Sequence, residues 1–186
     1  MAKKLFPLGK VGYKNTKQAK DDEVLQELQE AWPSRLEFSP LEIILNAIAV
    51  LFMLGTVIWA LASYSSLSAE IPMHYDIHGQ VDDYGSKTNI FILLAFDVLC
   101  VAGMAACSIF PRTFNIPVMF LKKRTIDEIL HATRLYLGVT NMGTAMIFFY
   151  LTACIIMGWQ LSTGIMMGLL ALILLPMVPY FIYLSR

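Results

Sequence analysis

The 186-residue chain is poor in charge and in cysteine. Only 15% of its residues are charged and 57% are hydrophobic, whereas soluble domains average about 25% charged and about 45–50% apolar residues. This balance excludes an ordinary soluble domain and a disordered chain. Three cysteines are too few for a disulfide framework. The net charge is zero, which argues against a nucleic-acid-binding protein, because such proteins usually carry a basic excess.

The sequence also lacks the short motifs of common catalytic and cofactor sites. It has no phosphate-binding Walker loop, dinucleotide-binding glycine motif, zinc-protease helix or nucleophile elbow. No pair of acids lies within the hydrophobic runs, and no internal repeat of the kind found in many transporters is visible. We therefore expect a protein that is not an enzyme and that carries no cofactor.

Four long hydrophobic runs dominate the sequence instead. They cover residues 43–62, 90–110, 135–158 and 164–184. A helix needs about 20 apolar residues to cross a bilayer, and four such runs leave too little polar surface for a soluble fold. We therefore predict an all-α fold, namely a four-helix integral membrane bundle in residues 41–186. Residues 1–40 should form a cytoplasmic basic tail with a short amphipathic helix.

The lysines and arginines fall on alternate sides of these runs. Seven lie in residues 1–40 and five in residues 111–134, whereas the 63–89 loop has only Lys87 and the 159–163 turn has none. Because basic residues favour the cytoplasmic side, both termini should lie inside the cell and the 63–89 loop should face outward. We expect a multi-pass protein of the bacterial cytoplasmic membrane, with the lipid bilayer as a partner and no nucleic acid. No cleavable signal peptide is visible, so the first run should serve as an uncleaved anchor.

Two local patterns predict where helices begin and bend. Thr125 is followed three residues later by Glu128, which is the spacing of a capping box, so a helix should begin there and continue into the third run. Pro176 and Pro179 should kink the fourth run near its cytoplasmic end. His131 lies on the helix that follows the capping box, and the sequence predicts no functional role for it.

The loop between the first two runs carries the most specific pattern. It reads Ile71-Pro72-x-His74-Tyr75-Asp76-x-x-Gly79-x-x-Asp82-x-x-Gly85-Ser86-Lys87. Its glycines and aspartates are turn residues, which indicates a compact folded loop. The pattern resembles the signature of a bacterial membrane family, domain of unknown function 1648, which also forms the N-terminal part of SdpI-type bacteriocin immunity and signal-transducing proteins. The resemblance covers residues 44–118 and includes Phe114-Asn115-x-Pro117.

The resemblance implies a membrane location and a role in recognition. The partner would be a peptide toxin, in immunity or signalling, or another membrane protein that this chain assists. The loop carries four acids and one lysine, so its own chemistry is acidic. We expect Gly79 and Gly85 to shape the loop and the following residues to bind the ligand or partner: His74, Asp76, His78, Asp82 and Lys87.

The loop also contains candidate metal ligands. His74, Asp76 and His78 alternate, so in an extended segment they would project from one face, and imidazole with carboxylate suits a divalent metal such as zinc. A bound metal would favour a metal-dependent membrane hydrolase. Two alternatives remain: His74 and Asp82 hold the loop together by hydrogen bonds while His78 is solvated, or a histidine senses pH.

Several polar residues lie within the hydrophobic runs, and three of them are candidates for a role inside the membrane. Asp97 is the acid deepest in a run, and such a residue usually faces the bundle interior. Counting about 1.5 Å per residue places Thr56 at a similar depth, so Thr56 is its expected hydrogen-bond partner. Asn141 should face another helix. Asp97 and Thr56 would either join two helices by a hydrogen bond, or Asp97 would serve a small transporter or channel.

The fourth run begins with Gly164-x-x-x-Gly168. This spacing of small residues permits close approach of two helices. It predicts either tight packing between the third and fourth helices or the face of a homodimer.

Overall fold

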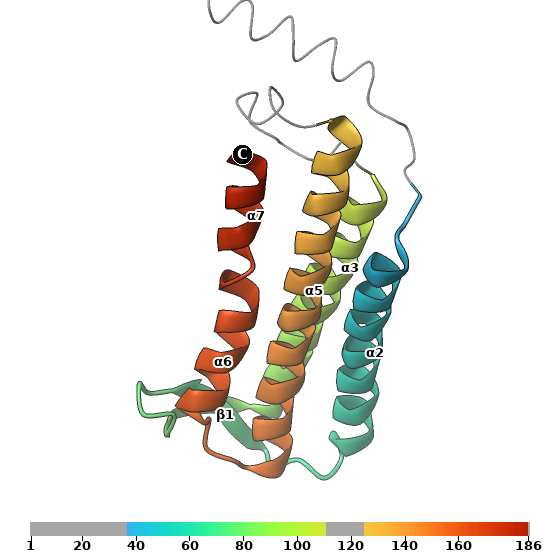
Figure 1. The fold of residues 1–186 in the computed structure, drawn as a ribbon. Helices are drawn as coiled ribbons and strands as arrows, with labels where there is room; N and C mark the ends of the chain where they lie inside the picture. The colour runs from blue at the N-terminus through green and yellow to red at the C-terminus, as the bar shows by residue number, and fades with distance from the viewer. Residues whose placement is uncertain (1–36, 111–124, 186) are drawn as a thin grey trace, which may run out of the picture.

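A computed structural model describes residues 37–110 and 125–185 of the chain. Figure 1 shows long helices lying side by side, and the described residues contain four that are long and apolar enough to cross a membrane. They are α2 (Pro40–Ser63), α3 (Ile90–Ile109), α5 (Ile126–Met157), and α6 (Thr163–Leu174) continued by α7 (Met177–Ser185). Within the described residues this confirms the prediction of four helices with the length and apolarity of membrane spans. The predicted basic tail, the amphipathic helix and the motif at 114–117 lie outside the described residues.

Capping boxes begin two of these helices. At the start of α2, the Ser39 hydroxyl accepts from the backbone N–H of Glu42, whose carboxylate accepts from the backbone N–H of Ser39. Thr125 and Glu128 do the same at the start of α5, as predicted. Because the box satisfies exposed backbone donors, α5 begins well before the apolar run that predicted its membrane span.

The fourth span is interrupted where proline was expected to bend it. A turn at residues 175–176 separates α6 from α7, because Pro176 has no N–H to donate and its ring obstructs the preceding turn. The prediction that Gly164 and Gly168 pack tightly against α5 is wrong, since nothing lies within 4 Å of a Cβ placed on Gly168. The close approach occurs at Gly143 of α5, where an added Cβ would lie 2.7 Å from Cγ1 of Ile173.

The loop between α2 and α3 is a β-hairpin, so the all-α prediction is wrong for this segment. Strands β1 (Glu70–Tyr75) and β2 (Val81–Ser86) pair antiparallel, with Glu70 opposite Ser86 and Tyr75 opposite Val81. A short 3-10 helix, η1 (Lys87–Asn89), leads into α3. The strands hold several aromatic and β-branched residues, which favour this conformation, but each is too short to produce a strong periodic signal.

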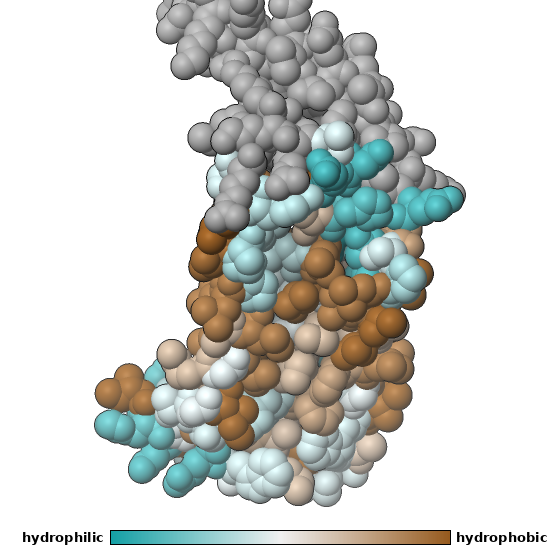
Figure 2. Space-filling view, viewed as in Figure 1, coloured by the Kyte–Doolittle hydropathy of each residue, from teal (hydrophilic) through white to brown (hydrophobic). Residues whose placement is uncertain are grey.

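The hairpin lies at one end of the bundle, and the N-terminal end of α2 and the C-terminal end of α7 lie at the other (Figure 1). Ile71 of β1 is buried in an apolar cluster with Ala60 of α2 and with Ile90 and Leu94 of α3. A second cluster lies deeper, around Ala49, Val101 and Ala145. Figure 2 shows hydrophobic residues over the middle of the bundle and hydrophilic residues towards both ends, as expected of a protein that spans a bilayer.

Candidate functional site

The turn of the hairpin is organised by Asp76. Its carboxylate Oδ1 accepts hydrogen bonds from the backbone N–H groups of His78 (2.8 Å) and Gln80 (2.9 Å). These bonds, led by the one from Gln80, hold the pKa of the Asp76 carboxyl below its usual value. The carboxylate therefore shapes the turn, and it points to the backbone instead of sharing a ligand face with His74.

Acidification should loosen this turn through Asp76. Because the folded protein lowers the pKa from 3.8, the turn is stabilised above about pH 4, and this stabilisation is lost as the pH falls through the lower folded pKa. Amide hydrogen exchange, corrected for intrinsic rates, should show falling protection at His78 and Gln80 below about pH 4. In the Asp76→Asn variant the protection of these amides should be lower at neutral pH and nearly independent of pH. Unchanged protection of the native chain in acid would contradict the assignment.

Gly79 fixes the tip of the hairpin to the bundle. Its carbonyl accepts a hydrogen bond of 2.8 Å from the backbone N–H of Leu161, in the turn between α5 and α6. Its φ is +78°, and a Cβ added there would lie only 1.7 Å from the Leu161 carbonyl oxygen. Only glycine fits this backbone and this approach. Gly79 therefore shapes the loop in two ways: its positive φ allows the hairpin turn, and its missing side chain allows the hairpin to pack against the α5–α6 turn.

Lys87 fixes the other end of the hairpin. Its Nζ lies 3.4 Å from the carbonyl of Tyr64, the C-cap of α2, and 3.5 Å from the carbonyl of Leu67, in the segment after α2. It also lies 4.9 Å from the centre of the Tyr64 ring. A cation is favoured beside carbonyls at the end of a helix. Gly85 leaves room for the Met73 side chain, because a Cβ added to Gly85 would lie 2.8 Å from Cγ of Met73. Lys87 and Gly85 therefore position the hairpin.

Tyr75 anchors the middle of the hairpin in the bundle. Burial raises the pKa of its phenol to about 12, with smaller contributions from Cys154 and Tyr150 of α5. Its hydroxyl is buried and has no hydrogen-bond partner among the described residues. The hairpin is thus held at its tip, at its base and between them.

The exposed face of the hairpin carries the paired side chains of His74 and Asp82. Nδ1 of His74 lies 2.6 Å from Oδ1 of Asp82, and the two side chains are 67% and 47% exposed. The pairing joins the two strands and agrees with the hydrogen-bonded alternative of the sequence analysis. Three apolar side chains of the hairpin segment are exposed as well, those of Met73, Ile77 and Tyr84.

The structure does not assemble the three candidate metal ligands. Strand β1 ends at Tyr75, so the alternation expected of an extended segment stops before Asp76 and His78. Asp76 faces the turn backbone, and His78 is exposed. Within residues 37–110 and 125–185, no three His, Cys, Asp or Glu side chains come together as metal ligands would.

Asp97 and Thr56 are both fully buried, but the predicted hydrogen bond between them is absent. The Thr56 hydroxyl donates to the Phe52 carbonyl one helical turn earlier (2.9 Å), a bond that threonine often makes within a helix. Neither oxygen of the Asp97 carboxyl has a hydrogen-bond partner in the described part of the chain. Asp97 lies on the buried face of α3 between Leu94 and Val101, and so between the two apolar clusters.

Asn141 joins α5 to α2, in agreement with the prediction that it faces another helix. Its Nδ2 donates to Oδ1 of Asn46 (3.2 Å), and Nδ2 of Asn46 donates to the Glu42 carbonyl (2.9 Å). The amide pair therefore extends towards a group of polar residues at the end of the bundle opposite the hairpin.

Glu42 and His131 form an interaction that the sequence analysis missed. The Glu42 side chain is almost completely buried, and its Oε1 lies 3.0 Å from Nδ1 of His131. The Ser39-x-x-Glu42 spacing before an apolar run is a visible capping-box signal. Nothing local indicates the contact with His131, because the two residues are 89 positions apart.

Arg134 is the third buried polar group at this end. Its Nε donates to the Ser108 carbonyl (2.8 Å) and one terminal nitrogen donates to the Glu37 carbonyl (3.2 Å). The guanidinium lies 4.0 Å from the centre of the Phe38 ring, and it is attracted by the Glu42 carboxylate. Arg134 therefore joins the ends of three helices, α2, α3 and α5.

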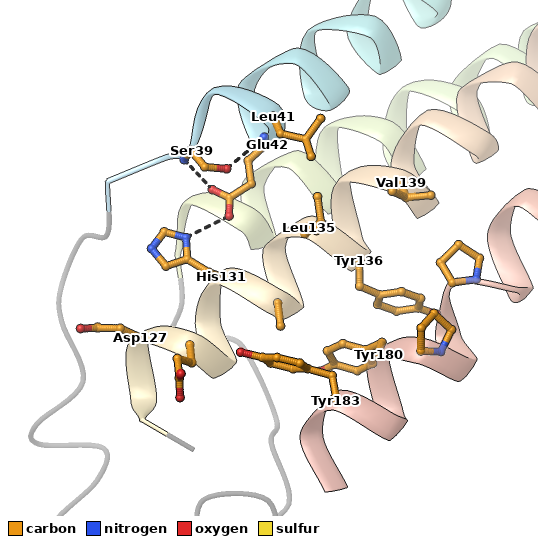
Figure 3. Close-up of a pocket in the computed structure, with 14 residues that line it drawn as sticks. Ser39, Leu41, Glu42, Asp127, His131, Leu135, Tyr136, Val139, Tyr180 and Tyr183 are labelled. Atoms are coloured by element: carbon orange, nitrogen blue, oxygen red, sulfur yellow. Dashed lines mark hydrogen bonds and ion pairs between the residues drawn. The ribbon is translucent and has the colours of Figure 1, made fainter. Parts of the chain in front are cut away.

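A groove of about 700 Å³ opens beside Glu42 and His131, between α2, α5 and α7. Figure 3 shows the Glu42–His131 pair at one side of the groove and tyrosines of α5 and α7 at the other. The molecule thus offers two separate candidate sites, the exposed face of the hairpin and this groove.

The comparisons with known proteins concern the hairpin and its flanking helices. No curated protein and no solved structure matches the chain. A family model covers the second half of α2, the whole hairpin and the first turns of α3, and all the residues that line the groove lie outside it. Residues 51–96 match the Domain of unknown function (DUF1648), which is the family that the loop motif predicted.

Proposed function

We propose that this membrane protein is non-catalytic and recognises a cationic, membrane-active peptide through the exposed face of its hairpin. One observation carries the proposal: the hairpin is fixed to the bundle through Gly79, Tyr75 and Lys87, yet its other face is left open. A rigid surface loses little conformational entropy when it binds a partner.

The chemistry of the open face suits a cationic amphipathic partner. The loop has four acids, and its one lysine is engaged by the carbonyls of Tyr64 and Leu67, just after α2. Complementary charge speeds the encounter with a basic peptide. Exposed Met73, Ile77 and Tyr84 would then bury apolar side chains of that peptide.

The family resemblance supports the same role. SdpI-type proteins, whose N-terminal part has this domain, act in immunity to a bacteriocin and in signalling. The distribution of basic residues supports an outward orientation of the hairpin, where a secreted peptide would arrive. By this proposal the protein intercepts the peptide at the outer surface of a bacterial cytoplasmic membrane, alone or as an accessory subunit of another membrane protein.

Combined replacement of His74 by alanine and Asp82 by asparagine should weaken peptide binding. Both side chains are exposed, so the bundle should keep its stability while a lysine-rich amphipathic peptide binds about ten-fold or more weakly, as expected for the loss of a central polar pair. Isothermal titration of the protein in neutral nanodiscs measures the affinity, and thermal unfolding checks the fold.

The matched control for this experiment is Asp127→Asn, which removes an exposed carboxylate at the opposite end of the bundle. It should leave the affinity for the peptide unchanged. Equal binding by the native chain and the double variant, or an equal loss in the control, would contradict recognition by the hairpin.

A further inference from the structure

The groove opposite the hairpin has the size of a small-molecule site. Its volume of about 700 Å³ lies within the range of about 300–1,000 Å³ that is usual for ligand pockets. It forms where the turn at Pro176 separates α6 from α7, and both Pro176 and Pro179 line it. It lies within segments long and apolar enough to span the bilayer, so its ligand can enter from the lipid phase.

One part of the groove is apolar. Leu41 of α2 and Leu135 and Val139 of α5 line it together with the two prolines of the fourth span. An alkyl chain on this surface would gain about 0.8 kcal/mol for each methylene group that leaves water.

A second part of the groove is aromatic. The rings of Tyr136 and Tyr180 are stacked with centres 4.9 Å apart, and the Tyr180 hydroxyl is hydrogen-bonded to the Thr133 hydroxyl (3.0 Å), which fixes the ring. Tyr183 lies beside them, as Figure 3 shows. Grouped aromatic faces attract ammonium groups, particularly quaternary ones, by cation–π interaction.

The third part is acidic. Asp127 and Glu128 of α5 and Glu42 of α2 line the groove, and His131 is paired with Glu42. Among the described residues that line it there is no lysine or arginine. Since Glu42 is held by its own partners and Glu128 caps α5, Asp127 is the carboxylate best placed to meet a ligand cation.

We propose that this groove binds a single-chain cationic amphiphile that enters from the bilayer. The alkyl chain lies along Leu135 and Val139, and the ammonium head lies between the tyrosines and Asp127. This site is independent of the hairpin, so either one can fail without the other.

The test uses the full chain in nanodiscs of zwitterionic lipid and radiolabelled dodecyltrimethylammonium as probe. Equilibrium dialysis should show saturable binding of one molecule per chain above that of empty nanodiscs. Dodecyl phosphate has the same chain and the opposite charge, and it should bind at least about ten-fold more weakly if the acidic part selects the head group. Absence of saturable binding, or equal binding of the two probes, would overturn the proposal.

Two pairs of variants localise the site. Val139→Phe fills the groove and should abolish binding, whereas Val98→Phe makes the same change on an exposed position of α3 and should not. Asp127→Asn should weaken binding about two- to five-fold by removing an exposed charge, while Asp82→Asn on the hairpin should have no effect. Asp127 is exposed, so its variant is informative even if Val139→Phe fails to fold. Unchanged binding in Asp127→Asn would refute the assigned position of the head group.

Discussion

Replacement of Gly79 by alanine should destabilise the hairpin end of the bundle by about 2–4 kcal/mol. A left-handed backbone conformation costs a residue with a Cβ about 1–2 kcal/mol, and Gly79 has a φ of +78°. The added Cβ would also lie 1.7 Å from the Leu161 carbonyl oxygen, so the hairpin must move and lose the hydrogen bond between Gly79 and Leu161, worth about 1 kcal/mol. Unfolding in mixed micelles measures the loss, and peptide binding should fall with it.

Gly158→Ala separates the two causes of this loss. Gly158 also has a positive φ, of +64°, but nothing lies within 4 Å of a Cβ placed there. This control should lose only the conformational part, about 1–2 kcal/mol, and should retain the binding of the peptide. Equal losses in the two variants would show that contact between the hairpin and the α5–α6 turn contributes nothing.

The features that could be predicted from the sequence are those that depend on local pattern. Four apolar runs predict four spans, because crossing a bilayer requires length and hydrophobicity in continuous sequence. The capping box at Thr125 and the break at Pro176 follow from the hydrogen bonds that individual residues make or cannot make. The loop motif predicted the family that matches residues 51–96.

The features that could not be predicted arise from contacts between distant segments. The hairpin is docked by Gly79 on Leu161, and Glu42 meets His131 across 89 residues. Counting residues from the ends of the runs placed Thr56 at the depth of Asp97, but depth does not say which way each helix is rotated about its axis. In the structure the Thr56 hydroxyl donates its hydrogen bond within its own helix. The candidate metal face does not form for a local reason, because the Asp76 turn ends the strand.

Replacement of Arg134 by methionine should have the largest effect, about 3–5 kcal/mol, because it removes two hydrogen bonds of a charged group, each worth about 1.5–3 kcal/mol. Arg134 and Ser108 are each 1% exposed, so water cannot replace the hydrogen bond to the Ser108 carbonyl, and the hydrogen bond to the Glu37 carbonyl is lost with it. The Glu42 carboxylate, also 1% exposed, would lose the charge that attracts it. Unfolding of the variant in mixed micelles, beside the native chain, measures the change.

Glu42→Gln tests whether the loss of stability in the Arg134 variant depends on the charge of Glu42. Added to the Arg134 variant, it should restore part of the stability, because the buried Glu42 carboxylate, left with only His131 and the Ser39 N–H as partners among the described residues, is then replaced by a neutral amide. Lys87→Met is the matched control: it also removes a cation bonded to helix-end carbonyls, but Lys87 is only half-buried, and the loss should stay within about 1 kcal/mol. Strictly additive effects of the Glu42 and Arg134 substitutions would show that the two charges are not coupled, and that Arg134 acts through its carbonyl hydrogen bonds alone.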